Sequence, residues 1–61
     1  MTTKELKPGN KYNATCFDGE TCTFLGVIEE CSDGSALISV EYRGKCYLAS
    51  NYQLTADVTK K

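Results

Sequence analysis

The chain has 61 residues, a length that fits one domain with a small core, because a chain of this size buries only about 60% of the surface that its unfolded form exposes. Seven basic and eight acidic residues leave a formal net charge of −1, which excludes the strongly basic footprint of a typical nucleic-acid-binding domain. The polar segment 1–7 is unlike a signal peptide, and no apolar stretch approaches the roughly 18 residues of a membrane span, so we expect a cytoplasmic protein without a membrane partner.

The pattern along the chain predicts an arm, five strands and a tail. Lys7-Pro8-Gly9-Asn10 has the composition of a turn, because proline presets the second turn position and glycine supplies a backbone conformation that other residues avoid. From Lys11 onward, short runs rich in Thr, Val, Ile, Tyr and Phe are separated by glycine-centred turns. We predict one domain, 1–61, with an arm and turn at 1–10, a strand region at 11–58 and a tail at 59–61. The predicted strands are 11–17, 21–30, 35–42, 45–49 and 54–58, with a 3₁₀ turn at 50–53.

The alternation of side chains assigns one face of these strands to the core, because successive side chains on a strand point to opposite faces. Odd positions are mostly polar, whereas even positions are apolar almost throughout: Tyr12, Ala14, Cys16, Cys22, Phe24, Ile28, Ala36, Ile38, Val40, Tyr42, Cys46 and Leu48. We therefore expect the even positions to form the core. Gly26 interrupts the longest predicted strand and indicates a bulge or bend there, so that one strand can serve two sides of a small barrel.

The four cysteines are expected to be free thiols. Their separations of five, eight and fourteen residues contain no C-x-x-C pair, and the chain has no histidine, so the pattern disfavours a zinc site. The alternation places Cys16, Cys22 and Cys46 in the core and leaves Cys31 at a turn. A secreted domain held by disulfides is the alternative. We expect no metal and no cofactor.

Segment 27–54 resembles the second half of an SH3 domain. In that family a strand with an acidic end leads to Asp-Gly, then to a hairpin with a glycine turn, and then to Pro-Ser-Asn-Tyr. Here Val27-Ile28-Glu29-Glu30 is followed by Asp33-Gly34, by the turn Arg43-Gly44 and by Ala49-Ser50-Asn51-Tyr52. The resemblance implies an all-β fold, a small, closed, five-stranded antiparallel SH3-like barrel with a 3₁₀ turn before the last strand. An Sm-like barrel is the alternative.

The resemblance does not extend to the polyproline groove of the family. Ser35 stands where the groove has a tryptophan, and Ala49 stands where it has a proline. Asn51 and Tyr52 match the motif residue by residue, with Tyr12 as a third candidate. A proline-rich helix binds on aromatic ridges, so the resemblance implies the barrel without the proline-binding activity.

Several outward positions are apolar and form the candidate interface. Phe17, Leu25, Val27, Leu37 and Tyr47 break the polar rule for odd positions, and a contiguous apolar set of this kind usually marks an interface. Alternatively, the ends of the chain cover the set through Leu6 or Val58. The candidate interface residues are Phe17, Leu25, Leu37, Tyr47, Asn51 and Tyr52.

The expected function is that of a non-enzymatic protein-interaction module. Catalysis is disfavoured because general acid–base chemistry usually recruits histidine, and the chain has none. We expect a small regulator or inhibitor, of the bacterial or phage kind, that binds a larger protein of unknown identity, and a homodimer is a second expectation. The alternative is an Sm-like or related barrel that binds RNA or DNA through Arg43, Lys45 and Tyr47, with bases stacked on tyrosine.

Overall fold

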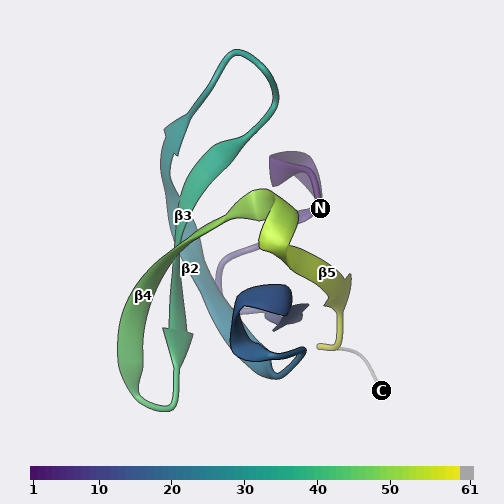
Figure 1. Ribbon diagram of the computed structural model, residues 1–61, viewed down its shortest axis with the longest axis vertical. Coiled ribbons are helices and arrows are strands. Elements are labelled where there is room, and N and C mark those ends of the chain that lie inside the picture. Colours follow the sequence, from purple (N-terminus) through teal and green to yellow (C-terminus); the bar gives the residue numbers. More distant parts are fainter. Residues whose placement is uncertain (60–61) are drawn as a thin grey trace.

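The computed structural model describes residues 1–59 and contains one antiparallel sheet of five strands (Figure 1). The strands are β1 (Lys11–Ala14), β2 (Thr21–Glu30), β3 (Ala36–Tyr42), β4 (Lys45–Ser50) and β5 (Leu54–Asp57). Three short 3₁₀ turns accompany them: η1 (Thr3–Glu5) in the N-terminal arm, η2 (Thr15–Phe17) between β1 and β2, and η3 (Asn51–Gln53) between β4 and β5. The predicted all-β fold with five antiparallel strands and a 3₁₀ turn before the last strand is confirmed.

The strand order in the sheet is β4-β3-β2-β1-β5. Strands β1 to β4 pair with their neighbours in the sequence, and β5 returns to pair with β1, so that Leu54 lies opposite Ala14. Strands β4 and β5 form the two edges, and over residues 1–59 they are joined by η3 rather than by a backbone ladder. The sheet is therefore not closed, and the prediction of a closed barrel was wrong in this respect.

Strand β2 bends because its pairing register with β3 shifts twice. One shift lies between Phe24 and Gly26 and the other between Val27 and Glu29, each leaving one extra residue on β2. Extra residues of this kind bend a strand and increase its twist. The bend expected at Gly26 is confirmed. The second shift occurs where the sequence has no glycine and therefore carries no signal for it. Beyond each shift, the alternation of side chains on β2 changes its phase relative to β3.

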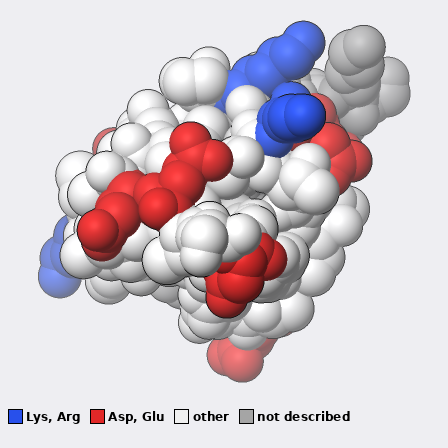
Figure 2. All heavy atoms as spheres, turned by 90° about the horizontal axis from the view of Figure 1, so that it is seen from above, with Lys and Arg blue, Asp and Glu red and all other residues white. Residues whose placement is uncertain are grey.

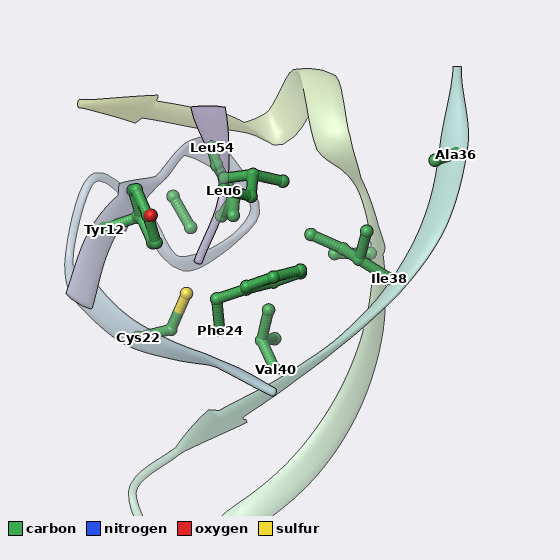
Figure 3. Packing of buried hydrophobic residues seen from close by; sticks show 10 residues of the cluster. Leu6, Tyr12, Cys22, Phe24, Ala36, Ile38, Val40 and Leu54 are labelled. Carbon is green, nitrogen blue, oxygen red and sulfur yellow. The ribbon is translucent and has the colours of Figure 1, made fainter. Parts of the chain in front are cut away.

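The core lies inside the curved sheet and is centred on Phe24 (Figure 3). The Phe24 ring meets the Tyr12 ring edge to face, with 6.3 Å between ring centroids and an interplanar angle of 86°. The buried Tyr12 hydroxyl accepts a hydrogen bond from the Lys7 backbone N–H at 2.9 Å and donates one to the Glu5 carbonyl at 3.3 Å. The N-terminal arm thus closes one side of the core, to which it also contributes Leu6. The remaining core residues are Ala14, Cys22, Ala36, Ile38, Val40, Ala49 and Leu54.

The predicted core placement of the cysteines is correct only for Cys22. Cys22 is buried, whereas Cys16, Cys31 and Cys46 are exposed, and all four are free. Cys16 lies in η2, where the period of two no longer holds, because β1 ends at Ala14 rather than at position 17. Cys46 is exposed because the alternation changes phase at the turn between β3 and β4.

The remaining differences between the predicted and the observed strands lie at the strand ends. Strand β5 ends at Asp57, and Thr59 follows it with its Oγ1 accepting a hydrogen bond from the Lys11 backbone N–H at 2.6 Å. Residues 60–61 of the predicted tail lie outside the described residues. No helix within residues 1–59 is long and apolar enough to cross a membrane.

Candidate protein-interaction surface

The surface of β2, β3 and β4 that points away from the core, which we name the outer face, carries an apolar patch. On β3 the buried residues Ala36, Ile38 and Val40 alternate with outward ones, so Leu37 and Ser39 lie on the outer face. Residues directly opposite each other on paired strands share a face. The outer face can therefore be followed across the sheet from the register of β3.

Leu48 lies opposite Ser39 and is thereby on the outer face of β4. On β2, the first extra residue, Leu25, precedes Gly26, and Gly26 also lies opposite Ser39. The second extra residue, Ile28, precedes Glu29, which lies opposite Leu37. The two residues of a bulge lie together opposite one partner. The outer patch is therefore made of four side chains that are exposed by 41, 56, 37 and 63%: Leu25, Ile28, Leu37 and Leu48.

Sequence reasoning missed Ile28 and Leu48, which the even-position rule assigned to the core. The turn at Arg43-Gly44 has only two residues, so Tyr42 faces Lys45, and an even position shares its face with an odd one. Because the length of this turn can be read from the sequence, the change of phase was predictable from the sequence alone. The bulges of β2 explain Ile28, and only one of them is marked by a glycine.

Within residues 1–59, neither the N-terminal arm nor the segment after β5 covers the outer patch. Leu6 is 6% exposed and belongs to the core cluster rather than to the outer face. Strand β5, which leads to Val58, lies at the opposite edge of the sheet from β4 and is separated from β2 by β1. The described parts of the termini therefore do not cover Leu25 or Leu37, and the alternative of an intramolecular cover fails for these two residues.

Carboxylates flank the outer patch. Glu29 lies opposite Leu37, and Glu41 lies opposite Cys46 at the end of the face nearest the Arg43-Gly44 turn. Neither carboxylate forms an ion pair with another described residue, since the salt bridge found in residues 1–59 joins Arg43 and Glu20. Figure 2, which looks down on the end of the molecule at the β2–β3 loop, shows several separate groups of acidic side chains across the surface, whereas basic side chains lie only near its margins in this view. The surroundings of the patch favour a partner that carries positive charge.

Tyr47 and Phe17, which the sequence predicted to be interface residues, lie away from the outer patch. Tyr47 faces the buried Val40 and therefore lies on the core side of β4. The Phe17 and Tyr42 rings are stacked, with 4.1 Å between centroids and 8° between planes, and the Tyr47 ring meets Phe17 at 5.4 Å and 65°. We name these three residues, Phe17, Tyr42 and Tyr47, the aromatic cluster. Phe17 and Tyr42 are partly buried and pack against the core.

The residues of the nucleic-acid alternative do not form a cationic groove. The Arg43 Nη2 group donates a hydrogen bond to Glu20 Oε1 at 3.2 Å, and the Tyr42 hydroxyl donates to the same oxygen. The hydrogen bond from Tyr42, together with that from Arg43, lowers the pKa of Glu20 below its usual 4.5, which keeps this carboxylate charged. Arg43 is thus neutralised by Glu20, and Lys45 remains as the cation nearest to Tyr47 in sequence. A phosphate would meet a carboxylate at this site.

Asn51 and Tyr52, the residues that match the SH3 motif, have different environments. The Asn51 side chain is fully buried: its Oδ1 accepts from the Ala36 N–H at 2.8 Å, and its Nδ2 donates to the carbonyls of Met1 at 2.8 Å and Gly34 at 3.3 Å. Asn51 is therefore a structural link between η3, the β2–β3 loop and the arm. Tyr52 is 57% exposed and keeps its hydroxyl beside Gly34.

The described residues hold no group of His, Cys, Asp and Glu that could bind a metal ion, and no cavity is found among them. Comparison of the chain with protein-family models, with curated proteins and with solved structures finds no match. The outer patch is therefore the feature of the molecule that bears on its function.

Proposed function

We propose that this chain is a non-enzymatic module that binds a larger protein through the outer patch. The observation that carries the proposal is the exposure of Leu25, Ile28, Leu37 and Leu48 on three adjacent strands of one small sheet. Isolated exposed apolar residues are ordinary, but a contiguous set surrounded by polar groups is typical of a protein-interaction site. In this proposal the chain acts as a small regulator or inhibitor of the protein that it binds.

The partner surface in this proposal is apolar at its centre and basic at its margin. Burial of the aliphatic side chains supplies the driving force for association. Glu29 and Glu41 beside the patch select for Lys or Arg on the partner and disfavour acidic surfaces. The interaction with RNA or DNA has no comparable support, because Arg43 already pairs with Glu20.

We further propose that the fold of the chain is SH3-like. It is supported by the strand order β4-β3-β2-β1-β5, with the turn η3 placed before β5. The proposal does not include polyproline binding, since Ala49 is buried and the Ser35 hydroxyl is hydrogen-bonded to Asp33 Oδ1 at 2.6 Å. It also includes a cytoplasmic location, which is supported by four free thiols, three of them exposed.

Quantitative affinity capture with matched variants tests this function. Ile28→Lys puts a charge into the patch at a residue that is 56% exposed, and Ala56→Lys makes the same change in charge on the exposed surface of β5. We expect a protein from the source cells that the parent chain and Ala56→Lys retain and that Ile28→Lys loses, and we expect the purified pair to behave in the same way in a titration. If Ile28→Lys is folded and retains every protein that the parent retains, the proposed function is wrong.

A further inference from the structure

The free edge of β4 is open to another strand. Strand β4 is one of the two edge strands of the sheet and lies along the left margin of the molecule in Figure 1. Natural edge strands are usually protected by charged residues, proline or bulges. Strand β4 carries one charged residue, Lys45 at its start, contains no proline, and pairs with β3 without a register shift. It therefore lacks the usual protection against pairing.

The turn at Arg43-Gly44 determines which backbone groups of β4 point outward. Both turn residues have positive φ, 54° and 79°, which is the type I′ geometry of two-residue hairpins. In such a hairpin the flanking residues Tyr42 and Lys45 exchange hydrogen bonds, and alternate residues along the strand then point their N–H and C=O groups away from the partner. The outward groups of β4 belong to Cys46, Leu48 and Ser50.

A separate contact agrees with this alternation. The Ser50 N–H donates to the Gln53 side chain at 2.8 Å as part of the cap of η3, so it is directed away from β3. The Ser50 donor is thereby occupied. The complete pairs of donor and acceptor left at the free edge are those of Cys46 and Leu48.

We propose that two copies of this chain associate by antiparallel pairing of their β4 strands, with the twofold axis at Tyr47. In this register Cys46 of each copy exchanges both backbone hydrogen bonds with Leu48 of the other, so that all four free groups of each edge are satisfied. Lys45 lies opposite the second copy's Ala49, and no like charges face each other. The pairing covers residues 45–49 and ends before Ser50, where the chain turns into η3.

The side chains of β4 suit this register on both faces. Tyr47 lies on the core side, so the two Tyr47 rings meet at the axis and connect the aromatic clusters of the two copies. Leu48, 63% exposed, lies on the outer face, so the outer patches of the two copies become continuous across the new ladder. This inference concerns the edge of the sheet and does not rest on the proposed partner.

Substitution of Cys46 tests the pairing while sparing the fold. Cys46→Pro removes a backbone N–H that makes no bond to β3, and proline is tolerated on an edge strand where that group faces solvent. Cys46→Ser keeps the N–H and serves as the control. Sedimentation velocity from micromolar to millimolar concentration should give a dimer for the parent and Cys46→Ser, and Cys46→Pro should raise the dissociation constant by at least about tenfold, because two symmetry-related hydrogen bonds are lost.

Amide hydrogen exchange of the unaltered protein provides a second test that needs no variant. The Cys46 and Leu48 amides should become more protected as the concentration rises, whereas the amide of Tyr47, bonded to β3, should show no such change. A protein that stays monomeric to millimolar concentration would contradict the proposal. So would a dimer that Cys46→Pro leaves intact and Ile28→Lys abolishes, because that dimer would form through the outer patch.

Discussion

Leu48 on β4 lies directly opposite Ser39 on β3, and this pairing directs the Leu48 side chain to the outer face, where 63% of it is exposed. A continuous count of even positions would have buried it. The two-residue turn reverses the relation between position and face, so Ala49 takes the core position beside Ile38 instead. The outer patch therefore exists because of one short turn and two bulges.

Two adjacent positions of β3 should respond in opposite ways to a lysine. Leu37→Lys, at an outer position that is 37% exposed, should change the free energy of unfolding by less than about 1 kcal/mol. Ile38→Lys, at a fully buried position, should cost several kcal/mol and leave the chain largely unfolded, because a domain of this size has little stability to lose. Circular dichroism with urea titration measures both. Equal stabilities of the two variants would show that the faces of β3 are assigned incorrectly.

Asn51 should be important for stability rather than for binding. Asn51→Ala leaves the buried Ala36 N–H without its acceptor, so we expect the free energy of unfolding to fall by about 2 kcal/mol or more. Tyr52→Ala, at the next position and exposed by 57%, should cost less than about 1 kcal/mol. Urea denaturation of the two variants makes the comparison. If Asn51→Ala left the free energy of unfolding unchanged, the hydrogen bonds between η3 and β3 would contribute little to stability.

The four thiols should react in two classes. Burial raises the pKa of the Cys22 thiol, with a smaller contribution from the neighbouring Cys16, and the same burial shields Cys22 from reagents. Brief alkylation of the folded protein, followed by mass spectrometry, should therefore modify Cys16, Cys31 and Cys46 well before Cys22. All four should react after denaturation without a reductant. Labelling of Cys22 at the rate of Cys46 would contradict the packing of the core, and fewer than four reactive thiols would indicate a disulfide.

Glu20 should contribute to stability in a pH-dependent way. The hydrogen bonds from Tyr42 and Arg43 lower its pKa in the folded state, so its contribution is present above the unfolded value of about 4.5 and is lost as the pH falls through the lowered value. The difference in Tm between the parent and Glu20→Gln should thus be largest near neutral pH and shrink in acid. Glu41→Gln, which changes the same charge without breaking a described hydrogen bond, is the control. A difference that stays constant down to acid pH would exclude this role for the Glu20 carboxylate.

The sequence predicted the strands better than it predicted their faces. Glycine-centred turns and β-branched runs mark each strand to within a few residues, because both signals are local. The face of a residue depends on register, which changes with every bulge and with the length of every turn. This is why alternation alone places Cys46, Ile28 and Leu48 in the core. It also groups Tyr47 with Leu25 and Leu37, although Tyr47 lies on the other side of the sheet.

The buried role of Asn51 could not be read from its type, because asparagine is usually exposed. Three of its hydrogen-bond partners, Ala36, Gly34 and Met1, are distant in the sequence and meet only in the folded chain. The open sheet was also beyond the local signals. Whether β4 and β5 pair depends on how η3 directs the chain between two edges.

Site-specific photo-crosslinking tests the outer patch as the binding surface most directly, because it records contact without disrupting it. A photoreactive phenylalanine analogue at position 37 should give a covalent adduct with a partner protein in the source cells. The same analogue at position 55, exposed on β5, should give none. Adducts of one partner from position 37 alone are the predicted result. Equal adducts from both positions, or adducts from position 55 alone, would contradict the assignment of the outer patch as the binding surface.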